Sequence, residues 1–423
     1  MRVYLRTFGC RANHYDTEAV REMIGAGGHT LVATPGEADV AVFNSCAVTA
    51  EAEADLRQSV RRAARANTAL RSVVMGCAAA LDRGSIRSLP TVSHTIAGAD
   101  LSAIAAALDL PPSVETAIAT RAQSAVRAVL RIQDGCDEHC TFCATTIARG
   151  QARSRPIDTL IAEARVLSER HPEIVLTGIH IGSWGVELGQ TLSALVTALV
   201  RAVPGVRFRL SSLEATEVDA SLRELLRSGN DCVTPHLHAP LQSASDRILR
   251  RMGRHWYTAR TYASAIETLV GDRPVFGLGA DVICGFPGET EADHQATRSL
   301  IEQLPFTYLH VFPFSARPGT PAERLRPTVS PLMIERRAAE LRAVGSRMTD
   351  AYRATRVGTL ADVVVTRGGT RCEGVTEDFL TVRVANGVPR GTRARARLTT
   401  EDHTLLATPE ADSPPLSRYL PVS

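Results

Sequence analysis

Apolar and polar positions along the first hundred residues alternate between short strand-like runs and longer helical stretches. Apolar runs predict strands at Val3–Phe8, Val40–Asn44, Ser72–Met75 and Thr91–Ala97. The stretches between and after these runs predict helices at Asp16–Ile24, Glu51–Arg65 and Leu101–Leu108. Because strands alternate with helices, residues 1–110 are predicted to form a doubly wound parallel sheet.

The same alternation returns at a larger scale from Ala128 onward. Strands are predicted at Ala128–Ile132, Ile174–Thr177, Val206–Leu210, Thr234–His238, Val275–Ile283 and Tyr308–Phe314. Helices between them include Asp158–Glu169, Asp219–Arg227, Thr258–Val270 and Glu291–Leu304. One βα unit of an eight-fold barrel takes about 30 residues, so residues 126–355 fit a partial (β/α)6 barrel.

Two further segments complete the predicted organisation. Residues 111–125 have no strong periodicity and are expected to form a linker. From residue 356 to residue 410 the pattern changes to short alternating strands, which predict a small β-barrel. These strands are Leu360–Thr366, Phe379–Val384, Thr392–Leu398 and His403–Ala407. Residues 411–423 are polar and rich in proline, and we expect a disordered tail there.

Composition narrows the class of protein. The chain has 423 residues, 44% of them hydrophobic, so it can build two or three ordinary cores. The net charge is only +3, and every basic residue is arginine, whose planar fork suits phosphate and carboxylate. No apolar run is long enough to span a membrane, and no signal peptide is evident. Nine scattered cysteines indicate a reducing cytoplasm and metal binding rather than a disulfide framework.

Three of these cysteines stand close together directly after the first barrel strand. Cys136, Cys140 and Cys143 have a C-x₃-C-x₂-C spacing. A closed zinc site or a fully ligated 4Fe–4S cluster needs four protein ligands. Three thiolates would leave one iron open to a substrate or cofactor. Our hypothesis from the residues is therefore a 4Fe–4S cluster with one vacant iron.

A second set of three cysteines is spread through the first hundred residues. Cys10, Cys46 and Cys77 each lie two residues past a predicted strand. The carboxyl ends of parallel strands lie at one edge of a sheet, so the three thiols are expected to converge there. The alternative is three buried structural cysteines, which are common in cores. The shared offset favours a second three-thiolate site.

Chemistry in a βα barrel is placed at the carboxyl ends of its strands, which gives further candidate residues. Gly178 permits close backbone approach, and Glu214 and the nearby serines suit hydroxyl and amino groups of a ligand. Each candidate has a structural alternative, such as a βα turn for Gly178 or satisfied core histidines for His236 and His238. Cys232, Cys284 and Cys372 are expected to be small hydrophobic residues rather than ligands. The candidates are Gly178, Ser211, Glu214, His236, Gln242 and Asp281.

Several motifs resemble those of a known family. The Cys136–Cys143 spacing, with Phe142 before the last cysteine, resembles the radical S-adenosylmethionine (SAM) signature. Thr7–Asn13, Asn44–Thr49 and Gly76–Ala78 resemble the three extra cluster segments of the radical SAM methylthiotransferases. Asp281–Thr290 fits the same family, and the resemblance covers nearly the whole chain. One departure is Ala144–Ile147, where the family usually has an Ile-Ile-Pro-Tyr-like run.

Within that family, one bacterial line modifies isopentenyladenosine in tRNA, one a ribosomal aspartate, and one threonylcarbamoyladenosine in tRNA. Val175–Gly185 and Arg209–Glu214 resemble the third line, and Pro235–Ser243 agrees with it. The resemblance implies methylthiolation of C2 of N6-threonylcarbamoyladenosine at position 37 of tRNA. It also implies SAM, two 4Fe–4S clusters and a low-potential electron donor of the flavodoxin or ferredoxin type. Phe142 would then join the six strand-end candidates in binding SAM.

The resemblance also divides the chemistry between the two cysteine sets. The Cys136, Cys140 and Cys143 cluster would bind SAM and generate a 5′-deoxyadenosyl radical that abstracts hydrogen from C2. The Cys10, Cys46 and Cys77 cluster would supply the sulfur. The C-terminal barrel resembles a TRAM domain, an RNA-binding module, with Gly374–Phe379 as the matching stretch. Independently, Arg393, Arg395 and Arg397 alternate along one strand and could share a phosphate-binding face, although a solvated face would look the same.

Three alternatives stay open at this point. The protein could be an isopentenyladenosine enzyme, an unrelated radical SAM enzyme with one auxiliary cluster, or a non-catalytic RNA-binding protein with structural metal sites. The last alternative needs a fourth ligand at each cysteine set. His139 is adjacent to Cys140, but no nearby cysteine or histidine supplies that ligand convincingly.

Overall fold

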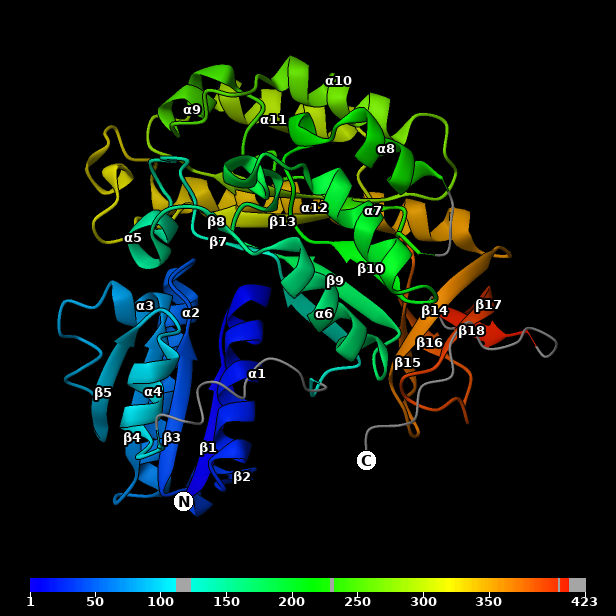
Figure 1. Ribbon diagram of the computed structural model, residues 1–423. Helices are drawn as coiled ribbons and strands as arrows, with labels where there is room; N and C mark the ends of the chain where they lie inside the picture. Colours follow the sequence, from blue (N-terminus) through cyan, green and yellow to red (C-terminus); the bar gives the residue numbers. More distant parts are fainter. Residues whose placement is uncertain (112–122, 229–231, 402–403, 411–423) are drawn as a thin grey trace. The chain divides into compact units, whose positions relative to one another are not determined.

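The structure is a computed structural model that describes the chain except for residues 112–122, 229–231, 402–403 and 411–423 (Figure 1). The predicted tail and most of the predicted linker lie outside the described residues. The chain divides into two compact units, which we describe separately. The first comprises Met1–Arg121, Gln133–Arg153 and Ser315–Arg324, and the second comprises Ala122–Ile132, Ser154–Phe314 and Leu325–Ser423.

The first unit is built on a five-stranded parallel sheet of order β2-β1-β3-β4-β5. Its strands are β1 (Arg2–Thr7), β2 (Thr30–Val32), β3 (Val40–Ser45), β4 (Arg71–Gly76) and β5 (Val92–Ala97). The β3 strand is buried along its whole length, which explains its continuous apolar run. The doubly wound parallel sheet predicted for this region is confirmed.

Helices cover both faces of this sheet. The helices of the unit are α1 (Arg11–Ala26), α2 (Ala50–Ala66), α3 (Cys77–Ala80), α4 (Leu101–Ala107) and α5 (Thr145–Arg149). Apolar residues of α1 and α4 pack with Val3, Val42 and Val73 on one face, whereas α2 packs with Phe43 and Val74 on the other. Thr49 caps α2 by accepting a hydrogen bond from the backbone of Ala52.

The second unit contains six parallel strands arranged as a partial barrel. They are β6 (Arg127–Arg131), β9 (Glu173–Thr177), β10 (Arg207–Leu210), β11 (His236–His238), β12 (Gly277–Cys284) and β13 (Tyr308–Pro313). They form two three-stranded sheets, β10-β9-β6 and β11-β12-β13, which isolated bridges join between Phe208 and Val233 and between Ser212 and His238. The predicted partial (β/α)6 barrel is therefore confirmed. Short strands β7 (Gln133–Asp134) and β8 (Arg153–Ser154) flank the cysteine loop in the sequence.

Helices surround this barrel and bury its outer face. They are α6 (Ile157–Ser168), α7 (Leu192–Ala202), α8 (Ala220–Arg227), α9 (Asp246–Arg251), α10 (Ala259–Val270), α11 (Glu291–Gln303) and α12 (Pro331–Arg356). Leu237, Ala280 and Val282 of the strands belong to the same core cluster as the helix residues. Since side chains alternate along a strand, His236, His238 and Asp281 face the inside of the barrel. Among the described residues, no helix is long and apolar enough to cross a membrane.

A closed five-stranded barrel of order β14-β15-β16-β18-β17 ends the described chain and belongs to the second unit. Its strands are β14 (Leu360–Arg367), β15 (Glu373–Thr376), β16 (Thr381–Val384), β17 (Arg393–Glu401) and β18 (Thr404–Pro409). Alternate residues such as Ala361, Val363, Ala396 and Leu398 fill its interior. The small β-barrel predicted from the alternating pattern is confirmed.

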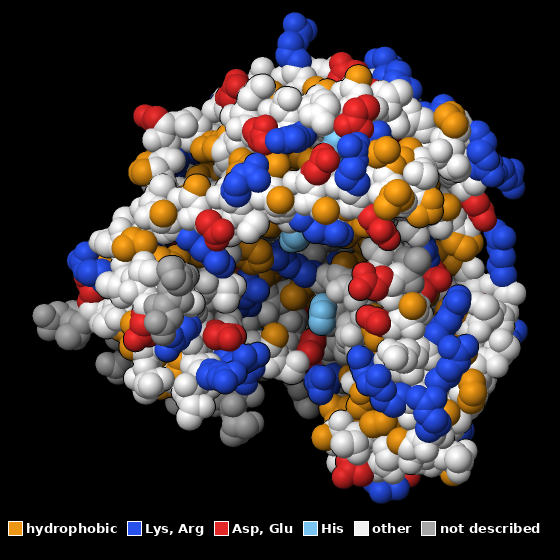
Figure 2. All heavy atoms as spheres, turned by 180° about the vertical axis from the view of Figure 1, so that it is seen from behind, with side chains coloured by type: hydrophobic (Ala, Val, Ile, Leu, Met, Phe, Trp, Pro, Cys, Tyr) orange, Lys and Arg blue, Asp and Glu red, His pale blue; other side chains and the backbone are white. Residues whose placement is uncertain are grey.

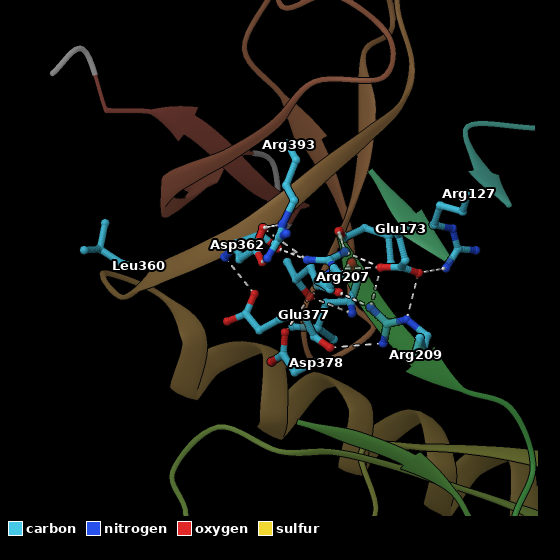
Figure 3. Close-up of polar contacts among 12 residues, drawn as sticks. Arg127, Glu173, Arg207, Arg209, Leu360, Asp362, Glu377, Asp378 and Arg393 are labelled. Carbon is cyan, nitrogen blue, oxygen red and sulfur yellow. Dashed lines mark hydrogen bonds and ion pairs between the residues drawn. The ribbon is translucent and has the colours of Figure 1, made fainter. Parts of the chain in front are cut away.

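The C-terminal barrel meets the (β/α)6 barrel through a buried network of charges, drawn in Figure 3. Glu173 of β9 accepts hydrogen bonds from Arg207 and Arg209 of β10, and all three side chains are at most 1% exposed. The same two guanidinium groups donate to backbone carbonyls of Thr376 and its neighbours at the end of β15. The ring of Phe379 lies 5.1 Å from the Arg209 guanidinium.

Candidate active site

The first three cysteines follow neighbouring strands of the five-stranded sheet. Cys10 comes after β1, Cys46 after β3 and Cys77 after β4, and these strands are adjacent in the sheet. Gly9, which precedes Cys10, lies directly against the Cys46 side chain, and Ser45 and Gly76, which precede Cys46 and Cys77, are register partners in β3 and β4. The structure therefore brings these three thiols together at the carboxyl edge of the sheet.

Gly9 makes this approach possible. It has a φ of +94°, which glycine adopts more readily than other residues, and an added Cβ would overlap the Cβ and Sγ of Cys46. The amide of Asn13 fixes the same turn by donating to the backbone carbonyls of Phe8 and Ser45, both at 2.9 Å. The thiol geometry thus depends on one glycine and one buried amide.

The environment of these thiols fits an anionic metal centre. Burial raises the pKa of Cys46 and raises that of Cys77 to about 11, while the Arg149 guanidinium beside Cys77 opposes the shift. The backbone N–H of Val48 lies 3.4 Å from the Cys46 sulfur and can stabilise a thiolate. Metal binding would displace protons from these buried thiols.

The second cysteine set lies in the loop that precedes α5, in the same compact unit. Cys136, Cys140 and Cys143 are partly buried, whereas His139 is exposed. The loop is closed by hydrogen bonds from Cys136 N–H to the Gly150 carbonyl and from Cys143 N–H to the Cys140 carbonyl, each 3.1 Å long. The N–H of Thr145 points at the Cys143 sulfur from 3.4 Å, as Val48 does at Cys46.

The spacing of the sulfur atoms bears on the kind of centre. Neither cysteine set, both of which lie in the described chain, brings three sulfur atoms within 4.8 Å of one another. Three thiolates around one tetrahedral zinc would be separated by about 3.8 Å. Both sets are therefore more open than a single-zinc site, and three thiolates are the donor set expected for the larger cluster with one open iron.

Arg149 connects the loop of the second cysteine set to the helix that begins after Cys10. Its guanidinium lies 2.8 Å from Asp16 and 2.9 Å from the Asn13 oxygen, and 3.1 Å from Asp134. Arg149 and Asp16 are nearly fully buried, so each charge compensates the other. We did not predict this role of Arg149 from the sequence, because Asn13 and Asp16 are more than 130 residues away from it.

The predicted SAM-binding residues of the barrel fall into two groups. Gly178, Ser211 and Gln242 lie just past β9, β10 and β11, where a ligand would sit. Gln242 has a φ of +60°, unusual for a residue other than glycine. Phe142 belongs to the cysteine loop in the other unit.

The other predicted residues already have protein partners. Glu214 is paired with Arg254, and burial raises the pKa of its carboxyl against the effect of that arginine. His236 lies 2.9 Å from the Tyr308 hydroxyl, and Asp281 lies 2.9 Å from His238. Although burial opposes it, His238 and His310 hold the pKa of the Asp281 carboxyl below its ordinary value.

One part of the predicted RNA-binding face is corrected by the structure. Arg395 and Arg397 are exposed on β17, as expected from the alternation. Arg393 is buried, and its guanidinium binds Asp362 at 2.8 Å and the Gly205 carbonyl at 3.0 Å. The outer face of this strand end packs against the (β/α)6 barrel, so Arg393 cannot contact RNA.

Family models match most of the chain. Residues 2–98 match a model described as an uncharacterized protein family, UPF0004, and residues 130–301 match the radical SAM superfamily. The threonylcarbamoyladenosine tRNA methylthiotransferase MtaB of Rickettsia prowazekii (strain Madrid E) is 33% identical over 94% of this chain and 95% of its own length. This chain belongs to the radical SAM methylthiotransferase family. It is a transferase, and as a radical SAM enzyme it uses SAM and a 4Fe–4S cluster.

Other relatives include both tRNA-modifying lines of the family. MtaB of Bacillus subtilis (strain 168) is 34% identical over 83% of this chain and 81% of its own length. A tRNA-2-methylthio-N(6)-dimethylallyladenosine synthase of Cereibacter sphaeroides (strain ATCC 17029 / ATH 2.4.9) is 31% identical over 96% of this chain and 98% of its own length. The radical SAM methyltransferase TsrM from Kitasatospora setae has a similar fold, with a TM-score of 0.56 at 13% identity and 76% coverage of each chain.

Proposed function

We propose that this methylthiotransferase adds a methylthio group to C2 of N6-threonylcarbamoyladenosine at position 37 of tRNA. The observation that carries the proposal is the presence of two separate three-thiol sets in one compact unit. The threonylcarbamoyladenosine line is supported by the MtaB relatives and by the Val175–Gly185 and Arg209–Glu214 motifs. The dimethylallyladenosine relative makes that base the second candidate substrate.

We assign one 4Fe–4S cluster to each cysteine set. The cluster held by Cys136, Cys140 and Cys143 would supply the electron that cleaves SAM. The cluster held by Cys10, Cys46 and Cys77 would supply the sulfur for transfer. The chain itself supplies the thiolates, the N–H donors of Val48 and Thr145, and the Arg149 charge beside Cys77. The electron would come from a flavodoxin-type or ferredoxin-type protein in the cytoplasm.

The residues at the barrel mouth would bind and orient SAM. Gly178 leaves room for close backbone approach, and Ser211 and Gln242 offer hydrogen bonds from adjacent strand ends. Phe142, in the cysteine loop of the first unit, is kept as a SAM-binding candidate on the family resemblance alone. Glu214 is held in place by Arg254, so its carboxylate is oriented before a ligand binds. We assign His236 and Asp281 a different role because histidine and tyrosine side chains already engage them.

The C-terminal barrel, which resembles a TRAM domain, would bind the tRNA backbone. Its phosphate contacts are assigned to Arg395 and Arg397, without Arg393. The protein surface mixes basic and acidic side chains, as Figure 2 shows for one face, so a few well-placed arginines rather than a large basic field would hold the RNA.

Changing Arg395 and Arg397 together to serine is expected to weaken tRNA binding and to reduce its salt dependence. Each lost phosphate contact lowers the slope of log affinity against log salt by about 0.7–0.9. Fluorescence anisotropy with labelled tRNA at several salt concentrations measures both quantities. The matched control replaces Arg367 and Arg383, two exposed arginines of β14 and β16, with serine and so removes the same two charges. An unchanged salt slope in the double variant would remove these residues from the RNA contact.

Nucleoside mass spectrometry of tRNA from a deletion strain tests the substrate. The methylthio group is expected to disappear from threonylcarbamoyladenosine and to remain on isopentenyladenosine. A plasmid copy of the gene should restore it, whereas a copy with Cys10→Ala should not. Loss from isopentenyladenosine alone would overturn the assignment and favour the second candidate.

A further inference from the structure

Three side chains on adjacent strands of the (β/α)6 barrel converge inside it, away from all six cluster cysteines in sequence. His238 lies on β11, Asp281 on β12 and His310 on β13. Asp281 and His310 are direct register partners, and His238 pairs with Gly279, two residues before Asp281. A glycine at position 279 leaves space that Tyr308 fills. The three side chains therefore share one face, opposite the apolar face that packs on the helices.

The ligand atoms are arranged around one carboxylate oxygen. His238 Nε2 lies 2.9 Å and His310 Nδ1 lies 3.2 Å from the same Oδ1 of Asp281. Among the described residues, this is the one group of three potential metal-binding side chains whose ligand atoms all lie within 4.8 Å of one another. Two ligands at about 2.1 Å from a tetrahedral metal are about 3.4 Å apart, so small movements would accommodate an ion.

Tyr308 supports the arrangement from behind. Its hydroxyl lies 3.1 Å from His238 Nδ1 and 2.9 Å from His236 Nε2. If the hydroxyl accepts from His238 Nδ1–H and donates to His236 Nε2, the lone pair of His238 Nε2 points toward Asp281. Without an ion that tautomer would set two lone pairs face to face, so His238 Nε2–H donates to Asp281 unless a cation lies between them. Metal-bound histidines in proteins are held in this way by a partner on the other ring nitrogen.

We propose that His238, Asp281 and His310 bind a divalent transition-metal ion, with Tyr308 orienting His238. Two imidazoles and one carboxylate suit Zn²⁺, Fe²⁺ or Mn²⁺ better than Mg²⁺ or Ca²⁺. Exposure rises from 7% for the His238 side chain to 24% for Asp281 and 54% for His310, so the site has an open side. An open side leaves coordination positions for water or for an oxygen atom of a substrate.

This site does not depend on the proposed function, because metal uptake can be measured without turnover. The probe is Co²⁺, measured by equilibrium dialysis and elemental analysis on the full-length protein with its iron–sulfur clusters in place. The wild type is expected to take up one Co²⁺ per chain more than His310→Ala and Asp281→Asn. His310 is exposed enough that its replacement should leave the fold intact, which thermal unfolding checks.

Two further variants separate a metal site from an ordinary hydrogen-bonded cluster. Tyr308→Phe is expected to weaken Co²⁺ binding by about 10–100-fold, because it removes the hydroxyl that orients His238 and leaves all three proposed ligands in place. His294→Gln is the matched control, since His294 pairs with Glu340 at 2.8 Å without belonging to the group of three, and it should bind Co²⁺ like the wild type. The proposal is overturned if the wild type takes up no more Co²⁺ than His310→Ala and Asp281→Asn.

Discussion

Gly9 is the residue on which the geometry of the first thiol set depends. Its positive φ turns the chain from β1 toward Cys10, and its missing side chain leaves space for Cys46. The three cysteines were predicted from their shared offset past a strand. The need for glycine at position 9 arises because the segments of Cys10 and Cys46 approach closely in space. The pattern of apolar residues does not predict that approach.

Gly9→Ala is expected to remove one cluster while leaving the other. The added methyl group would displace Cys46, so iron per chain after anaerobic reconstitution should fall from about eight to about four atoms. Gly84→Ala is the control, because Gly84 also has a positive φ (+103°) but nothing within 4 Å of an added Cβ. Equal iron contents in the wild type and Gly9→Ala would contradict this role.

At the scale of secondary-structure elements, α5 and α1 are joined by Arg149. The buried pair with Asp16 holds the loop of Cys136, Cys140 and Cys143 in the same unit as the five-stranded sheet. A buried pair adds little net stability by itself, but removing one partner leaves an uncompensated charge.

Arg149→Met is expected to lower the free energy of unfolding by about 3–5 kcal/mol, since the buried Asp16 carboxylate would lose its counter-charge. Adding Asp16→Asn should restore part of the loss. Chemical denaturation of the full-length protein measures these differences. Arg153→Met, a change at an exposed residue of the same unit, should have little effect. If Arg153→Met lowers the free energy of unfolding as much as Arg149→Met does, the loss is not specific to the Arg149–Asp16 pair.

Most elements could be predicted because their apolar patterns are regular. The predicted strands at Val40–Asn44 and Ile174–Thr177 match β3 and β9 within a residue at each end. Four short strands, β2, β7, β8 and β15, were missed because two to four residues carry too little alternation. The long α12 helix was missed because buried Arg337 and Gly345 interrupt its apolar period.

At the scale of the described molecule, burial between the two barrels of the second unit changes the roles of charged residues. The alternation along β17 correctly placed Arg393 with Arg395 and Arg397, but it could not show that Arg393 packs against Gly205 of another segment. The same junction buries Glu377, which Arg356 contacts at 2.8 Å. Burial, and then the neighbouring Asp378, raise the pKa of the Glu377 carboxyl to about 7.

This raised pKa predicts a pH dependence of stability. The folded state binds the Glu377 proton more tightly than the unfolded state, whose reference value is 4.5. The stability that protonated Glu377 contributes to the folded state is therefore complete below pH 4.5 and is lost as the pH rises through about 7. The melting temperature should fall across this range. Glu377→Gln should flatten that fall. The control is Glu373→Gln, a more exposed glutamate of the same barrel, which should retain the fall in melting temperature. If Glu377→Gln shows the same fall as the wild type, the pH dependence belongs to another group.

We infer that this chain transfers a methylthio group to threonylcarbamoyladenosine in tRNA. The most direct test incubates the reconstituted protein with SAM, a low-potential reductant and purified tRNA carrying either modified base, followed by nucleoside mass spectrometry. We predict 2-methylthio-N6-threonylcarbamoyladenosine as the product, with no product from isopentenyladenosine tRNA. Methylthiolation of isopentenyladenosine, or SAM cleavage without transfer to either tRNA, would contradict the account.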